Sequence, residues 1–196
     1  MLIKKSPTKK DRAFIQKLGL LCFGSVELEI LKHLKQKLGK IFEHIFSEIQ
    51  IIEEVKEFPE SSFNPEWNKY SAPLILLDIN EFVNQTNYDK VLGITSLDLY
   101  EPERDFIYGL AQYGSDAKAA IISIHPFYEE FYKTLPNMEL FLLRLVKEAI
   151  HEIGHLLGLD HCSNKCVMMR SEVVLDVDKK PASFCDICWK NISSRN

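Results

Sequence analysis

The segment that most constrains the fold of this chain is residues 151–161, HEIGHLLGLDH, which carries three histidines and a glutamate. Residues four apart in an α-helix lie on one face, one turn above the other. His151 and His155 can therefore present ring nitrogens to a single cation from one rigid helix. We expect the helix to end at Gly158, because a left-handed C-terminal residue is least costly for glycine. The turn that follows would let His161 bind the same cation from outside the helix.

This spacing is typical of a catalytic zinc site. Three protein ligands that leave one position open for water lower the pKa of that water to about 7. Glu152 is rotated one step away from the ligands, so it is better placed to accept a proton from the water than to bind the ion. The alternative is a set of ordinary solvated histidines on an amphipathic helix. A chance match to the whole pattern is expected in on the order of one such chain in 10^5, so we prefer the zinc site.

The residues before this motif predict one long helix over about residues 136–158. Its apolar positions recur at helical spacing; they are Leu142, Leu145, Ala149, Ile153 and Leu156. Its polar positions fall on the other side; they are Arg144, Lys147, Glu148, His151 and His155. We therefore expect the two histidines to lie on a polar face that is open to a cleft, with a core behind it.

Four cysteines form a second cluster directly after the third histidine. They occur as two close pairs, Cys162 with Cys166 and Cys185 with Cys188. Such pairs are typical of a structural zinc bound by four thiolates, and two disulfides or reduced core cysteines are the alternatives. The N-terminus does not resemble a secretory signal, so we expect a cytoplasmic location, where metal binding is favoured over disulfides. The fifth cysteine, Cys22, is expected to be a small core residue.

The sequence over residues 151–188 resembles the archaemetzincins, a branch of the metzincin zinc peptidases. Their signature is H-E-x-x-H-x-x-G-x-x-H-C, then a cysteine closely followed by methionine, and then C-x-x-C; here Cys166-Val167-Met168 forms the middle step. Further similar residues are Asp178, Lys180 and Phe184, with segments 70–76, 91–95, 98–100 and 120–123. The resemblance implies that Met168 forms a Met-turn, the apolar floor of the three-histidine site.

The chain departs from the family pattern at two places. Three residues, rather than the usual four, separate Cys162 from Cys166. Arg170 stands where some other metzincins have a tyrosine two residues beyond the methionine, so the resemblance identifies no oxyanion-stabilising residue. Three tyrosines are instead expected to be structural or to lie at the rim of the site; they are Tyr108, Tyr113 and Tyr128.

Length and composition favour one domain, because 196 residues of which 46% are hydrophobic can bury a sizeable core. Within residues 1–196 we expect an upper α/β subdomain over about residues 12–158 and a lower one over about residues 159–196. A net charge of -4 argues against a nucleic-acid partner. No apolar stretch reaches the roughly 18–20 residues that span a bilayer, so no membrane is expected either. The lysines at positions 4, 5, 9 and 10 are expected to belong to a frayed end.

Hydrophobic periodicity and turn residues predict alternating strands and helices. Strands are expected over residues 18–23, 44–55, 90–95, 106–112 and 119–124, and helices over residues 26–37 (capped by Ser25) and 72–84. Residues 61–71 are expected to form a loop, and residues 113–116 a hairpin turn.

The predicted fold is α/β: a mixed, mainly parallel twisted sheet with an antiparallel edge strand and flanking helices. A small, irregular, zinc-bound C-terminal subdomain would follow, and the whole matches the metzincin-like fold that the resemblance implies. The strand over residues 106–112 would be the antiparallel one. It is either an ordinary edge strand or one that pairs with an extended peptide substrate.

The sequence thus predicts a zinc-dependent metallopeptidase of archaemetzincin type with two Zn²⁺ ions per chain. His151, His155 and His161 would bind the catalytic ion with Glu152 as general base, and the four cysteines would bind the structural ion. Each histidine should be neutral, with its second ring nitrogen bound to an acceptor. A zinc-stabilised peptide-binding protein with little or no turnover is one alternative, and a zinc-dependent amidase on a non-peptide bond is another. The expected partner is a peptide or protein substrate.

Overall fold

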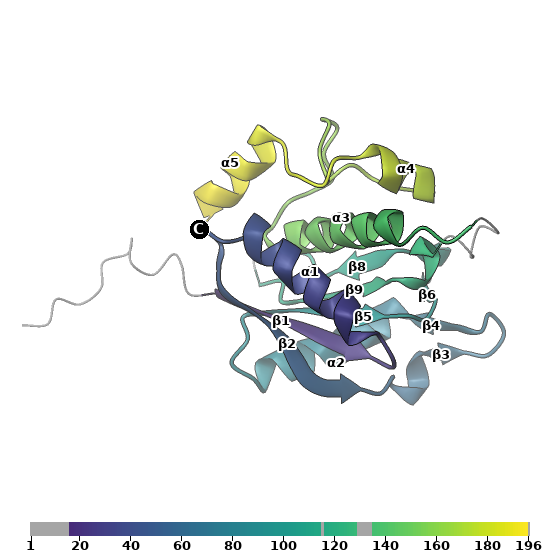
Figure 1. Ribbon diagram of the computed structural model, residues 1–196. Coiled ribbons are helices and arrows are strands. Elements are labelled where there is room, and N and C mark those ends of the chain that lie inside the picture. Colours follow the sequence, from purple (N-terminus) through teal and green to yellow (C-terminus); the bar gives the residue numbers. More distant parts are fainter. Residues whose placement is uncertain (1–15, 115, 129–134, 196) are drawn as a thin grey trace, which may run out of the picture.

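The computed structural model describes residues 16–114, 116–128 and 135–195, whose helices and strands are arranged as Figure 1 shows. The largest element is a five-stranded sheet in the order β2-β1-β5-β9-β8. Its strands are β1 (Gln16–Phe23), β2 (Phe46–Lys56), β5 (Lys90–Thr95), β8 (Gly109–Ala111) and β9 (Ala119–Ser123). β2, β1, β5 and β9 run parallel, whereas β8 is antiparallel to β9. This confirms the predicted mixed, mainly parallel sheet with an antiparallel edge strand.

Helices cover both faces of this sheet. α1 (Leu28–Ile41) and α3 (Met138–Leu156) lie on one face and α2 (Ala72–Asn84) on the other (Figure 1). The cause is visible along β1, whose side chains alternate between two cores. Leu18 and Leu20 pack in the core of α1 and α3, and Leu21 and Phe23 pack in the core of α2. Strands that are buried on both faces read as nearly continuous apolar runs, as this one does.

The chain also forms a four-stranded sheet in the order β3-β4-β6-β7. Its strands are β3 (Phe63–Asn64), β4 (Lys69–Ser71), β6 (Leu99–Glu101) and β7 (Arg104–Ile107), and a 3-10 turn, η1 (Glu60–Ser62), precedes them. The prediction of a loop over residues 61–71 is therefore wrong. In this segment β3 pairs with β4, and β4 pairs with β6, which lies far along the chain and gives no local pattern.

The strand predicted over residues 106–112 is divided between the two sheets. β7 ends at Ile107 and pairs with β6, whereas β8 begins at Gly109 and pairs with β9. Tyr108 lies at the change of sheet. Its carbonyl accepts a hydrogen bond of 2.8 Å from the Ser123 N–H, and its buried ring stacks on Phe127 with centroids 5.6 Å apart. Tyr108 is thus structural, as expected.

Other predicted boundaries agree with the structure. α2 and β5 have the predicted bounds, and β1, β2 and β9 match theirs within two residues at each end. The helix predicted over residues 26–37 starts later and runs further, over Leu28–Ile41. Ser25 does not cap it, because the helix begins after Glu27, and the Glu27 side chain makes no capping hydrogen bond.

α3 confirms the long predicted helix. A 3-10 turn, η2 (His125–Phe127), precedes it, and Asn137 caps it by accepting a hydrogen bond of 3.0 Å from the Leu140 N–H. After α3 come α4 (Val174–Lys179) and α5 (Asp186–Arg195), which lie beyond α3 on the side away from the sheet (Figure 1). None of the helices in the described part of the chain is long and apolar enough to cross a bilayer. The lysines at positions 4, 5, 9 and 10, and Ser115 of the predicted hairpin turn, lie outside the described residues.

Gly93 in β5 is packed so closely that a larger residue should destabilise the fold. A Cβ atom there would lie 2.6 Å from Ile121 Cδ1 and 2.7 Å from Ile79 Cδ1. Gly93→Ala is therefore expected to lower the free energy of unfolding by about 1–2 kcal/mol, as measured by urea denaturation. Gly39→Ala is the matched control, because nothing lies within 4 Å of a Cβ atom at that helical position. It should raise the free energy of unfolding by about 0.5–1 kcal/mol. A Gly93→Ala protein as stable as the wild type would contradict this packing.

Candidate metal centre

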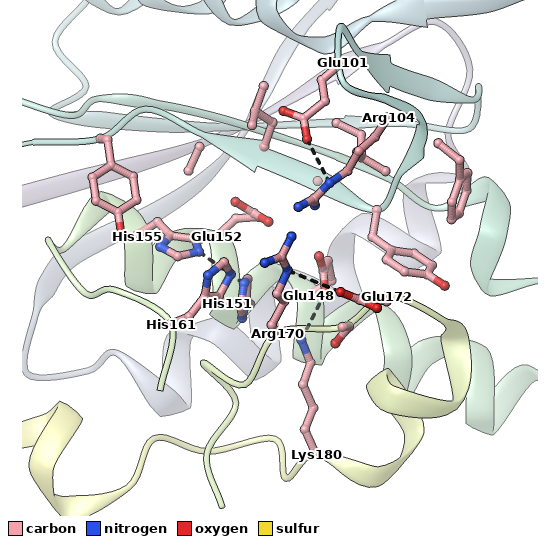
Figure 2. A pocket seen from close by; sticks show the side chains of 18 residues that line it. Glu101, Arg104, Glu148, His151, Glu152, His155, His161, Arg170, Glu172 and Lys180 are labelled. Carbon is pink, nitrogen blue, oxygen red and sulfur yellow. Dashed lines mark hydrogen bonds and ion pairs between the residues drawn. The ribbon is translucent and has the colours of Figure 1, made fainter. Parts of the chain in front are cut away.

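The three histidines of the motif meet at one point, as Figure 2 shows. One ring nitrogen from each lies within 4.8 Å of the other two. His151 and His155 project from the last turns of α3 and are buried, with their Nε2 atoms 3.1 Å apart. His161 comes from the loop after the helix, is exposed, and places its ring centroid 5.0–5.3 Å from the other two.

The turn that brings His161 back is built on Gly158, as the sequence predicts. Gly158 has φ 82°, in the left-handed region that glycine adopts without steric cost. Its N–H donates to the His155 carbonyl at 2.9 Å, and the Leu159 N–H donates to the Gly154 carbonyl at 2.9 Å. This pair of bonds is a Schellman motif, which ends α3 and reverses the chain.

Backbone carbonyls hold the two helical histidines in one orientation. His151 Nδ1 lies 2.9 Å from the Val167 oxygen and His155 Nδ1 lies 2.8 Å from the Leu159 oxygen. A carbonyl can only accept, so each Nδ1 carries the proton and each Nε2 presents its lone pair to the shared point. Burial lowers the pKa of His151 well below its ordinary value and also lowers the pKa of His155. The His161 residue is exposed as a whole, but partial desolvation of its ring, with the nearby charges of Lys180 and Arg104, lowers its pKa as well. All three rings are therefore neutral at neutral pH, the form that binds a metal.

The spacing of the donors fits zinc. A tetrahedral zinc with nitrogen ligands at about 2.0–2.1 Å separates two of them by about 3.3 Å, and the Nε2 atoms of His151 and His155 are 3.1 Å apart. The imidazole donors suit the same ion. The geometry of the three rings is thus that of a single cation site, with room for a fourth ligand on the side of the cleft.

The four cysteines also come together. Cys162 and Cys185 have their Sγ atoms 3.8 Å apart, and Cys166 and Cys188 have theirs 3.7 Å apart. Four thiolates at about 2.3 Å from a tetrahedral zinc would be about 3.8 Å from one another, whereas a disulfide needs about 2.05 Å. All four thiols are free. The sulfur positions therefore fit a four-thiolate metal site and do not fit two disulfides. The fifth cysteine, Cys22, is buried in β1, as expected.

The thiols of this cluster differ in acidity. The backbone N–H of Cys188 lowers the pKa of Cys185 to about 7. Burial raises the pKa of Cys166 and that of Cys188. At neutral pH the buried thiols are protonated unless a cation is bound, so metal binding here would release protons.

The cysteine loop touches the histidine site directly. Val167 lies between Cys166 and Met168, and its carbonyl is the acceptor for His151. The loop is held by two backbone bonds of 2.9 Å, from the Val167 N–H to the Ser183 carbonyl and from the Cys162 N–H to the Met168 carbonyl. The two clusters therefore share one piece of backbone.

Met168 is fully buried beneath α3, next to Gly154. A Cβ atom at Gly154 would collide with Met168 Sδ and lie 3.0 Å from Phe184 Cε1. Any larger residue at this second variable position of the H-E-x-x-H motif would require Met168 to move, because methionine and phenylalanine occupy the space below it.

Glu152 lies beside the histidines and against β8. It is buried, and a Cβ atom at Gly109 would lie 2.8 Å from its Oε1. Burial, with the nearby carboxylate of Glu148, raises the pKa of Glu152 well above its ordinary value. A carboxylate in this environment takes up a proton readily.

The polar face of α3 opens to a cleft at its histidines, as predicted, but its earlier turns are buried beneath the C-terminal segment. Arg144 makes two bonds of 2.7 and 2.8 Å to the carboxylate of Asp178. Lys147 Nζ donates to the Val177 and Asp178 carbonyls at 2.9 and 2.8 Å, and Lys180 Nζ lies 3.3 Å from Glu148 Oε2, with both side chains buried. From this helix Glu148, His151, Glu152 and His155 line the cleft. The segment that leads into Cys185 covers the rest.

The cleft over the histidines has a volume of about 440 Å³. One wall is formed by residues 106–111, and the opposite wall includes residues 170–172.

Tyr113 lies at the rim of the cleft. Its side chain is exposed, and its ring centroid is 5.7 Å from that of His155. The Tyr113 hydroxyl donates to Asp160, which raises the pKa of Tyr113 to about 12. Tyr128 instead stacks on Phe141 at 4.3 Å. Arg104 and Glu101 also line the cleft, and no local signal in the sequence points to them.

Known proteins resemble this chain in both sequence and structure. A model of peptidase family M54 matches residues 17–194. An archaemetzincin from Methanocaldococcus jannaschii is 38% identical over 173 residues, which is 88% of this chain and 90% of the relative. Among solved structures, an archaemetzincin from Archaeoglobus fulgidus complexed with malonate has a TM-score of 0.76 and 33% identity, over 90% of this chain and 99% of that chain. One from Methanopyrus kandleri has a TM-score of 0.78 and 30% identity, over 92% and 95%.

The shared backbone between the two clusters predicts that damage to the cysteines weakens metal binding at the histidines. In the double variant Cys185→Ser, Cys188→Ser the Val167 carbonyl should lose its fixed position. Zinc affinity at the histidines should then fall by roughly tenfold or more, measured by competition with a chelator. Cys22→Ser is the matched control, because it makes the same substitution in β1, away from both clusters. Unchanged affinity in the double variant would refute the coupling.

Proposed function

This chain belongs to the archaemetzincins, peptidase family M54, and we propose that it hydrolyses peptide bonds as a zinc-dependent metallopeptidase. The observation that carries the proposal is the meeting of three histidine nitrogens and the buried carboxylate of Glu152 in one cleft, beside an edge strand. The family relationship supports the same chemistry.

We assign the two metal sites as follows. His151, His155 and His161 would hold the catalytic zinc, and Met168 would serve as the Met-turn residue below it. When bound, this ion would polarise the peptide carbonyl and lower the pKa of a water molecule. Cys162, Cys166, Cys185 and Cys188 would hold a second, structural zinc, which would add folding free energy to the C-terminal segment.

Glu152 would act as the general base and then as the general acid. Its raised pKa makes its carboxylate a stronger proton acceptor than an exposed glutamate. The carboxylate would take a proton from the attacking water and then deliver it to the nitrogen of the leaving amine. Contact with Gly109 restricts the side chain to a position beside the cleft, because the backbone of β8 closes the space behind it.

The free edge of β8 would bind the substrate as an added strand. Residues 108, 110 and 112 face β9, because the Tyr108 carbonyl accepts from Ser123 and the Gln112 N–H donates to Ala119. In an antiparallel ladder the alternate residues direct their N–H and C=O groups away from the partner strand. Gly109 and Ala111 therefore face outward, toward the cleft side of the sheet edge. A peptide or protein segment could pair with them in an extended conformation.

Glu152→Gln tests the proposed chemistry. The amide cannot accept the proton, so kcat/KM against a peptide library should fall by about 10²–10⁴-fold relative to the zinc-loaded wild type. Glu29→Gln, an exposed carboxylate on α1, is the matched control and should retain full activity.

Equal turnover by the wild type and Glu152→Gln would refute the assignment of the base. Absence of turnover from both zinc-loaded proteins, with peptide binding retained, would favour a zinc-stabilised peptide-binding protein. Turnover restricted to non-peptide amides would favour an amidase that uses the same residues.

Ala111→Pro tests strand addition at β8. Proline removes an outward N–H and is tolerated on an edge strand when that group faces away from the ladder. The variant should fold normally and bind peptides about tenfold more weakly, as measured by fluorescence anisotropy. Leu110→Pro is the contrasting control, because it removes an inward bond to β9 and should lower the melting temperature. Full peptide affinity in folded Ala111→Pro would rule out pairing at this edge.

A further inference from the structure

The cleft contains two arginines to which the proposed hydrolysis assigns no role. Arg104 belongs to β7 on one side of the cleft, and Arg170 follows Met168 by two residues on the other side. Both line the cleft together with the histidines and Glu152. In Figure 2 both guanidinium groups point into the space in front of these residues. A group bound there would be approached by a positive charge from each wall.

Both arginines are held only loosely by their neighbours. Arg104 Nε lies 3.5 Å from Glu101 Oε1, and Arg170 Nε lies 3.8 Å from Glu172 Oε1. Arg144, by contrast, makes two bonds of 2.7 and 2.8 Å with Asp178 and is buried. A guanidinium carries five N–H donors in a planar fork that matches a carboxylate. Within the described part of the chain, the ion pairs of Arg104 and Arg170 involve the Nε side and leave the terminal nitrogens toward the cleft.

The charges of the cleft also favour an anionic ligand once the histidine site is loaded. Four glutamates, two arginines and one lysine line the cleft. Glu148 and Lys180 are paired with each other in its buried part. A divalent cation at the histidines would change the net charge of the cleft from -1 to +1. The positive groups nearest the opening are then the two arginines.

The position of Arg104 relates it to the proposed substrate strand. Gly109, five residues later on the edge strand β8, lies against Glu152, and an extended chain advances about 3.3 Å per residue. The backbone of Arg104 in β7 is therefore at most about 17 Å from that of Gly109. Its side chain is directed into the cleft (Figure 2). A peptide along this edge would bring a residue roughly three positions from the scissile bond into reach of the guanidinium.

We propose that Arg104 and Arg170 form a carboxylate-binding subsite that selects peptides with an acidic group within about three residues of the scissile bond. The carboxylate comes from an Asp or Glu side chain or from the free C-terminus of a short peptide. This inference rests on the proposed peptide-binding function and adds its substrate class.

Peptide binding by the zinc-loaded Glu152→Gln protein tests the subsite without requiring turnover. The probes are fluorescein-labelled alanine-based peptides that differ only in a central Glu, Gln or Lys, each with a free or an amidated C-terminus. The Glu peptide should bind at least about fivefold more tightly than the Gln peptide, and the Lys peptide most weakly. Adding Arg104→Gln or Arg170→Gln should remove this difference, while Lys35→Gln, an exposed lysine on α1, should preserve it.

The arms of the experiment separate the sources of the carboxylate and the ways in which the idea can fail. A loss of affinity only on amidation would assign the subsite to the C-terminal carboxylate, and a preference for central Glu would assign it to a side chain. Equal binding of Glu and Gln peptides with either terminus, or tighter binding of the Lys peptide, would overturn the subsite while leaving peptide binding intact. If none of the peptides bound, peptide binding would fail and the subsite with it.

Discussion

The hydrogen bond from His151 to the Val167 carbonyl is the contact on which the rest of the site depends. It joins α3 to the loop between Cys166 and Met168, and it is buried on both sides. An unmade bond in this place would leave polar groups without water, at a cost of about 1–3 kcal/mol. The N–H of Val167 donates to the Ser183 carbonyl at 2.9 Å, which helps to fix the position of the Val167 carbonyl. The orientation of the His151 ring therefore depends on the folding of the segment that carries Val167 and Ser183.

The charged residues on α3 act on the same segment from the other side. Arg144, Lys147 and Glu148 are removed from water by the residues around Asp178 and Lys180, which satisfy them in turn. Burying an ion costs several kcal/mol unless it is paired and hydrogen-bonded, so neither side is stable without the other. The C-terminal segment is thus attached to the helix by specific polar contacts as well as by the apolar contacts of Phe184 and Met168. Because polar contacts have directional geometry, they fix the position of the C-terminal segment on α3.

Local patterns in the sequence predict a large part of this fold. The bounds of α2 and β5, and the end of α3 at a left-handed Gly158, follow from periodicity and from the conformational preference of glycine. The grouping of the three histidines and of the four cysteines also follows from spacing, because both sets lie within short stretches of chain.

Features that depend on distant partners could not be predicted in this way. The change of sheet at Tyr108 is invisible because the apolar pattern continues across it, and the acceptor for His151 comes from a carbonyl, which every residue has. The histidines on the polar face of α3 open to a cleft, as predicted, but the burial of Arg144 and Lys147 on the same face has no local signal. The groups that bind these two side chains lie 30 or more residues later. Arg104 reaches the cleft only because β7 pairs with β6 in a second sheet.

The shared backbone between the two clusters also gives the site an order of assembly during synthesis. The histidines leave the ribosome before Cys185 and Cys188, which lie 24 or more residues later. Until those residues are made, the loop that carries Val167 has only two of the four clustered cysteines beside it. A nascent chain therefore contains the helix with its two histidines but lacks the fixed Val167 carbonyl that orients His151. Tight metal binding at the histidines would therefore arise only after Cys185 and Cys188 have been made and the C-terminal segment has packed against α3.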